Sequence, residues 1–189
     1  ALDHHSGNLL DGNWHHVVMS RNNENTIYLY VDGVQGTSTA TTNTRFFNSS
    51  SGIGGGGYAT NDGNNGTPGG GGIVYGGGWN GYMSQVRLTK GNSRYPFWPK
   101  KETITTSTSY QTGVTVTSSN VQAIACHHAT ITTNGGNSGT AFTASGDPAV
   151  SSFAPNGGMK SVLFDGTGDY LTSNDSDYSA TNGAFTMEC

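Results

Sequence analysis

The sequence predicts an all-β protein built as an antiparallel β-sandwich, and three observations support this. Thr, Val, Ile, Tyr and Phe recur in short bursts separated by clusters of Gly and Asn, which is typical of short strands joined by turns. No window keeps the 3.6-residue periodicity of an amphipathic helix. Charged residues are only 11% of the chain and its formal charge is -4, whereas disordered chains combine low hydrophobicity with high net charge.

The first strand-like segment is residues 14–21, where even-numbered and odd-numbered side chains fall on opposite faces. A polar turn separates it from a second strand over residues 26–31. Asp32-Gly33 is a strong hairpin signal and leads into a third, weaker strand over residues 34–41, which we expect at a sheet edge. Such a meander has to bury its apolar face against a second sheet.

Residues 49–78 are very rich in glycine, and we interpret them as a surface loop. The alternative is that the glycines allow positive φ angles or a close approach of the backbone to a ligand. A phosphate-binding loop is not indicated, because no Gly-Lys-Ser/Thr follows and no helix pattern begins here. Residues 79–88 return to strand alternation, and we expect Trp79, at the head of this strand, to lie in the core.

A second connection is predicted around Pro96 and Pro99, followed by a Thr/Ser-rich stretch in which residues 114–116 could form an edge strand. Order is expected to resume at residue 121. Five further short strands are then predicted over residues 121–126, 141–144, 161–164, 170–172 and 185–189. A tight turn over residues 165–169 joins the third of these strands to the fourth.

Five motifs resemble the laminin-G-like (concanavalin A-like lectin/glucanase) superfamily. Trp14-His-His-Val-Val-Met-Ser-Arg21, Ile27-Tyr-Leu-Tyr-Val-Asp-Gly33 and Trp79-Asn-Gly-Tyr-Met-Ser-Gln-Val-Arg-Leu88 are similar, in this order, to elements of the C-terminal half of that fold. Val162-Leu-Phe-Asp-Gly-Thr-Gly-Asp-Tyr-Leu171 and Phe185-Thr-Met-Glu-Cys189 are similar to its beginning. The resemblance implies an antiparallel jelly-roll β-sandwich.

The two halves of this resemblance stand in inverted order. Residues 1–98 resemble the C-terminal half of one repeat and residues 120–189 the N-terminal part of the next, with a Thr/Ser-rich linker over residues 99–119. Each half alone leaves an apolar sheet face uncovered, and two solutions remain open. The halves combine as a circularly permuted sandwich, or each is completed by a neighbouring copy in a head-to-tail assembly. We expect the chain to be a segment of a longer protein.

Composition excludes several function classes. The eight Lys and Arg residues are scattered, so no phosphate-neutralising stripe indicates a nucleic-acid partner. No apolar run approaches the roughly 20 residues of a membrane-spanning helix, and no signal peptide is visible at the start. Cys126 and Cys189 each lie in an apolar or β-prone run, where a free thiol behaves as a small hydrophobic group, so a disulfide between them is not favoured.

Catalytic chemistry is not indicated. Glucanases that share the sandwich use two carboxylates, usually as Glu-x-Asp-x-x-Glu on one strand. The chain holds only three glutamates, and these are isolated from one another: Glu24, Glu102 and Glu188. A Gly-x-Ser-x-Gly nucleophile motif is absent as well. The three His-His pairs do not indicate zinc, because neighbouring residues of a strand point to opposite faces.

Calcium is the metal that the resemblance implies, because laminin-G and pentraxin-like relatives bind it at one end of the sandwich through Asp, Asn and carbonyl oxygens. Asn61 and Asp62 follow the Ile53-Gly54 segment, where such relatives have ligands, and Asp165 and Asp169 flank a Gly-rich turn. The candidate calcium ligands are therefore Asp62, Asp165 and Asp169. Ordinary turn chemistry explains the same Asp-Gly pairs and stays open as an alternative.

Glycan binding is the other function that the resemblance implies. Sugar sites combine aromatic platforms with Asn and Asp side chains, and one loop after residue 57 is rich in both. Its candidate ligand-binding residues are Tyr58, Asn61, Asp62, Asn64, Asn65 and Tyr75. We therefore predict a non-catalytic structural or adhesive repeat module of a virion (tail fibre or capsid-associated) or of an extracellular surface assembly, with copies of itself, neighbouring proteins or glycans as partners. A calcium-dependent lectin is the first alternative and a glycoside hydrolase fragment is the second.

Overall fold

The computed structural model describes most of the two predicted halves of the chain. It covers residues 9–24, 26–40, 50–54, 58–60, 72–74, 78–91, 118–174 and 184–189. In these ranges the regular structure is almost entirely strand, apart from a short 3-10 helix over Ser118–Asn120, and the strands pair in antiparallel fashion. The predicted all-β sandwich is therefore confirmed. No helix in the described ranges is long and apolar enough to cross a membrane.

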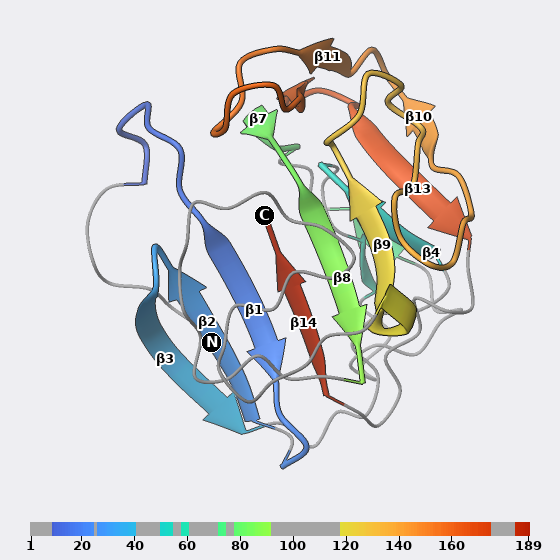
Figure 1. Ribbon diagram of the computed structural model, residues 1–189. Coiled ribbons are helices and arrows are strands. Elements are labelled where there is room, and N and C mark those ends of the chain that lie inside the picture. The colour runs from blue at the N-terminus through green and yellow to red at the C-terminus, as the bar shows by residue number, and fades with distance from the viewer. Residues whose placement is uncertain are drawn as a thin grey trace.

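The first layer is a six-stranded sheet that draws on both halves of the chain. Its strands are, in spatial order, β3 (Val34–Ala40), β2 (Thr26–Val31), β1 (Val17–Arg21), β14 (Phe185–Glu188), β8 (Val86–Lys90) and β9 (Val121–Ala125). Figure 1 shows β14, the last strand of the chain, lying between β1 and β8. Strands from both sides of the expected linker thus pair with each other within one chain.

The β1–β2–β3 meander contains the hairpin between its second and third strands that the sequence predicts. Asp32 and Gly33 both adopt positive φ angles, 48° and 78°, as a two-residue hairpin turn requires. β3 lies at the edge of the sheet, as expected. The division of the chain at residues 99–119 stays a prediction, because residues 92–117 lie outside the described residues.

The second layer consists of two three-stranded sheets, and two segments of the chain pass from one sheet to the other. One contains β10 (Thr143–Ser145), β13 (Tyr170–Asn174) and β4 (Ser50–Ile53), and the other contains β11 (Ala149–Ser151), β12 (Ser161–Asp165) and β7 (Asn80–Met83). A short bend connects β10 to β11, and a short turn connects β12 to β13. The two connections lie side by side and form one corner of the second layer. A separate hairpin pairs β5 (Tyr58–Thr60) with β6 (Gly72–Val74).

The hydrophobic core lies between the β8–β9 end of the first layer and the second layer. Its buried members are Val86, Ala123, Ala125, Cys126, Phe142, Val162, Phe164 and Leu171. Gly54 shows why a glycine was needed at one edge of this core. Its φ is +82°, and a Cβ at this position would lie 2.3 Å from the ring of Phe164.

Three sequence-based expectations about elements were wrong. Residues 79–88 form two strands instead of one, because Gln85 adopts a φ of 57° that interrupts the pleat between β7 and β8. Trp79 is 48% exposed rather than part of the core. The stretch 49–78 contains β4, β5 and β6 rather than only a loop. Their low β propensity is overridden by partners such as β13, which pairs with β4 from more than 100 positions away in the chain.

The outer edge of β9 is closed by a loop. The amide groups of Gly135 and Asn137 donate to the carbonyls of Ile124 and Val121 at 3.0 and 2.7 Å, and Asn134 Oδ1 accepts from the Ile124 amide at 3.1 Å. Backbone groups that would otherwise recruit another strand are thereby satisfied.

Candidate functional site

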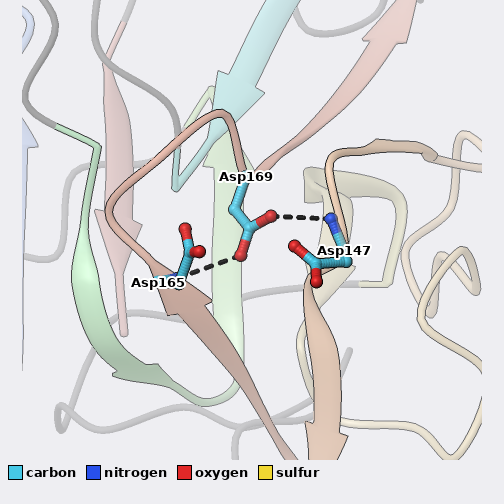
Figure 2. A group of neighbouring side chains, drawn as sticks. All are labelled: Asp147, Asp165 and Asp169. Carbon is cyan, nitrogen blue, oxygen red and sulfur yellow. Dashed lines mark hydrogen bonds between the residues drawn. The ribbon is translucent and has the colours of Figure 1, made fainter.

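The candidate site is the corner at which the second layer bends, and it is centred on the carboxylate of Asp169 (Figure 2). Asp169 ends the turn between β12 and β13 and is only 2% exposed. The glycines of the two bends, Gly146, Gly166 and Gly168, all have positive φ angles between 75° and 85°. These glycines allow both chains to turn sharply around one side chain.

Both oxygens of Asp169 accept hydrogen bonds from the backbone. Oδ1 accepts from the Asp147 amide at 2.8 Å, and Oδ2 accepts from the Asp165 amide at 3.0 Å, as Figure 2 shows. Asp165 Oδ1 in turn accepts from the amide of Thr167 at 2.6 Å. The buried carboxylate therefore joins the β10–β11 bend to the β12–β13 turn, which satisfies backbone donors of both segments.

Three carboxylates meet at this corner. Asp147, Asp165 and Asp169 can each offer an oxygen so that the three atoms lie within 4.8 Å of one another, and Asp147 and Asp165 are exposed. No ion pair between them and a Lys or Arg occurs in the described parts of the chain. Three hard oxygen donors fit part of a calcium shell, which takes six to eight oxygens, so carbonyls and water would have to supply the rest.

The structure brings two of the three predicted calcium ligands together and adds one that the sequence did not indicate. Asp165 and Asp169 lie at the corner, whereas Asp62 lies outside the described residues. Asp147 was missed. Its Gly146-Asp147-Pro148 context signals a turn, but nothing in the local sequence shows that this turn meets Asp169 twenty-two positions later.

The predicted glycan-binding residues stay a prediction. Tyr58 begins β5, and its backbone lies opposite Val74 of β6. The other members of the set lie outside the described residues: Asn61, Asp62, Asn64, Asn65 and Tyr75.

Glu188 occupies a second buried carboxylate site, in the middle of the six-stranded sheet. It is 1% exposed and Arg87 is fully buried beside it. Arg87 donates from Nε to Glu188 Oε1 at 2.6 Å and also contacts this oxygen through Nη2. His16 Nε2 lies 3.5 Å from Glu188 Oε2. A glutamate held in this way is committed to an ion pair, so it lacks the access to substrate that a glycosidase acid or nucleophile needs.

His15 forms an exposed clamp with two aspartates. Its Nδ1 lies 2.7 Å from Asp32 Oδ2 and its Nε2 lies 3.0 Å from Asp11 Oδ1, so the ring can donate to both only as the imidazolium ion. Hydrogen bonds to Asp32 and then Asp11 raise the pKa of His15. Hydrogen bonds from Asn13 and then His15 lower the pKa of Asp11 to about 2. Partial burial acts to raise the pKa of Asp32, but the hydrogen bonds from His15 and the His16 amide outweigh it and lower the pKa.

Neither cysteine has the features of a reactive group. Both thiols are free, and Cys189 packs against the core cluster that contains Cys126. Burial raises the pKa of Cys126 strongly, and burial followed by the charge of Glu188 raises the pKa of Cys189 to about 11. A buried thiol that stays protonated is inert at neutral pH.

Comparison with known proteins agrees with this architecture. Residues 1–91 match the family model of the laminin G domain. Searches of curated proteins and of solved structures found no match. The laminin-G-like assignment is thus confirmed over residues 1–91, which contain three of the five motifs, and the antiparallel sandwich is the fold expected for it.

Proposed function

We propose that this chain is a non-catalytic structural or adhesive module of a virion or extracellular surface assembly. Its partners would be copies of itself or neighbouring proteins of that assembly. The laminin G match over residues 1–91 supports a binding module. The observation that carries the non-catalytic part is the burial of Glu188, which is committed to Arg87 and His16 in the sheet where a glucanase would expose its carboxylates.

The corresponding experiment measures hydrolysis. The intact chain and its E188Q variant are incubated with β-1,3-glucan, β-1,4-glucan, xylan and agarose, and reducing ends are counted. We expect neither protein to release sugar. Turnover by the native chain would overturn the proposal, and loss of that turnover in an E188Q variant that circular dichroism shows to be folded would make Glu188 a catalytic residue.

A calcium-dependent lectin is the second candidate, and the corner of Asp147, Asp165 and Asp169 favours it. A cation placed there would be attracted by three carboxylates, two of which are exposed. Asp147 is the ligand to change, because its backbone amide, rather than its side chain, makes the bond to Asp169. The D147N variant therefore leaves the hydrogen bonds of the corner in place.

Calcium binding is measured by calorimetry and by thermal unfolding with and without calcium. If the corner binds calcium, the melting temperature rises with calcium concentration, because a ligand that binds only the folded state stabilises it. D147N weakens the effect, and the matched D32N variant in the exposed clamp does not. Glycan-array binding that a chelator abolishes would support the lectin, and silence on a broad array would count against it.

A further inference from the structure

The turn between β11 and β12 places an Asn-Gly pair in an open position. Asn156 begins this turn, and its carbonyl accepts a hydrogen bond from the amide of Met159 at 3.2 Å. Gly157 and Gly158 are exposed, and a Cβ on either residue would meet no atom within 4 Å. The surroundings of this turn therefore do little to restrict rotation of its backbone.

An Asn-Gly pair can react with itself when its backbone is free to rotate. The glycine amide nitrogen attacks Cγ of the asparagine, and no Cβ on the glycine blocks this approach. A bond forms between N and Cγ, the bond between Cγ and Nδ2 breaks, and ammonia leaves with the amide proton. Water then opens the resulting succinimide at one of its two carbonyl carbons. The net reaction consumes water, releases ammonia and leaves aspartate or isoaspartate.

The structure describes three of the Asn-Gly pairs in the sequence, which begin at Asn80, Asn134 and Asn156. Asn80-Gly81 lies in β7, where the backbone of both residues pairs with β12. The extended conformation of a strand keeps the glycine amide away from Cγ of the asparagine. Because the pairing with β12 also prevents the rotation that would bring the two atoms together, this pair should react slowly.

Asn134-Gly135 is restrained at both of its reacting groups. Oδ1 of Asn134 accepts from the Ile124 amide at 3.1 Å. Nδ2 of Asn134 donates to Ser138 Oγ at 2.9 Å and to the Thr140 carbonyl at 3.1 Å. The amide of Gly135, which is the attacking group, donates to the carbonyl of Ile124 at 3.0 Å. The loop that closes the outer edge of β9 thus also restrains the two groups that would have to react.

We propose that Asn156 is a site of spontaneous deamidation, at which the folded chain converts its own side chain to aspartate or isoaspartate. Among the described residues, neither the amide of Gly157 nor the side chain of Asn156 makes a hydrogen bond, so both reacting groups are available. The two successive glycines of the turn allow the rotation that brings them together. The reaction goes beyond the function proposed above, because it requires only water.

Deamidation would change a surface that three aromatic side chains share. The turn follows Phe153 in the chain, and the ring of Phe153 lies 5.0 Å from the ring of Tyr82 and 5.4 Å from that of Trp14, measured between centroids. Aspartate adds a negative charge near these rings, and isoaspartate also lengthens the connection between β11 and β12 by one backbone atom. Because the ammonia is lost to solvent, the change accumulates with the age of the protein.

The test follows each asparagine by peptide mass spectrometry after the intact chain is incubated in oxygen-18 water at neutral pH. Oxygen-18 enters only the residues that react during the incubation, and chromatography separates the aspartate from the isoaspartate peptides. We expect Asn156 to be converted at least about tenfold faster than Asn134, because several hydrogen bonds have to open before Asn134 can react. Unfolding of the chain in urea should remove this difference.

Variants of the turn test the proposed attack itself. N156Q should abolish the fast conversion, because glutamine would have to close a less favourable six-membered ring. G157A should slow it severalfold through the added Cβ. Alanine fits this position, because the φ of Gly157 lies outside the left-handed region and the Cβ would have open space. V150A is the matched control, because Val150 is exposed on neighbouring β11 and takes no part in the reaction.

Three results would overturn the proposal. The first is an Asn156 that stays unmodified while the unfolded chain reacts. The second is equal conversion of Asn134 and Asn156 in the folded chain, which would show that the reaction occurs only after unfolding. The third is a G157A variant that is folded by circular dichroism and reacts as fast as the native chain and V150A.

Discussion

In the described part of the chain two carboxylates are buried, Glu188 and Asp169, and their charges are balanced in different ways. Glu188, at the centre of the six-stranded sheet, faces the guanidinium of Arg87 and the ring of His16. Asp169, at the corner of the second layer, faces backbone amides of Asp147 and Asp165. Glu188 joins strands that are 101 positions apart in the chain through a full opposite charge. Asp169 joins two bends that are 22 positions apart through peptide dipoles.

This difference indicates which carboxylate remains available for chemistry. The charge of Glu188 is already balanced by the guanidinium of Arg87, so a second cation would be attracted only weakly to this carboxylate. The charge at Asp169 is only partly balanced by amides, and two further aspartates stand beside it. An added cation is therefore favoured at the corner and disfavoured in the sheet, and this contrast can be tested by breaking each site in turn.

The largest effect is expected from R87A. Removal of the guanidinium leaves Glu188 buried without its main partner, and loss of one member of a buried ion pair costs about 3–5 kcal/mol of unfolding free energy. Urea denaturation followed by far-ultraviolet circular dichroism measures this value. The double variant R87M/E188L removes both charges and should recover much of the loss. A destabilisation below about 1 kcal/mol for R87A would show that the pair is hydrated rather than buried.

A smaller effect is expected from D169A, which takes the acceptor away from two backbone amides. Because an unsatisfied, partly buried donor costs about 1–3 kcal/mol, we expect a loss within this range. The matched control is D165A, whose exposed carboxylate serves only the Thr167 amide and should matter less. Equal effects of the two variants would contradict the central role assigned to Asp169. Hydrogen exchange of the Asp147 and Asp165 amides reports the same bonds directly.

The smallest effect is expected at the exposed clamp of His15, Asp11 and Asp32. Solvent weakens the electrostatic interactions there, whereas the buried Arg87–Glu188 pair is shielded from solvent. The pKa of His15 is raised in the folded state, so its stabilisation is present below the unfolded value near 6.5 and is lost as the pH rises through the raised pKa. The pKa of Asp32 is lowered, so its contribution is lost as the pH falls through that lowered value.

The clamp is tested by comparing the native chain with H15Q across this pH range. We expect a difference of about 0.2–1 kcal/mol for the His15–Asp32 pair at mildly acidic pH, and a smaller difference at alkaline pH. Titration of the His15 ring followed by nuclear magnetic resonance gives the pKa itself. A ring pKa at or below the ordinary histidine value would show that the two carboxylates do not hold the imidazolium.

The sequence predicted the local parts of this fold well. The Asp32-Gly33 hairpin, the strand over residues 26–31 and the last strand, predicted over residues 185–189 and observed over Phe185–Glu188, depend on neighbours in the sequence, and all three are present. The division of residues 79–88 into two strands was not predictable, because it depends on Gln85 meeting the chain near Cys126. Strand β4 in the glycine-rich region was missed for a related reason, since its partner β13 lies more than 100 residues away.

The candidate sites show the same difference between features that depend on sequence neighbours, which were predicted, and features that depend on distant segments, which were not. The sequence by itself determined the strand-and-turn pattern, the laminin-G-like motifs and the turn that carries Asp165 and Asp169, because side-chain alternation and turn chemistry act over a few residues. Only the tertiary structure decided that Asp147 joins that turn, that Glu188 is committed to Arg87 and that Trp14, Tyr82 and Phe153 share one surface. These contacts arise from strand pairing across the whole chain, and no local pattern encodes which distant segments will meet.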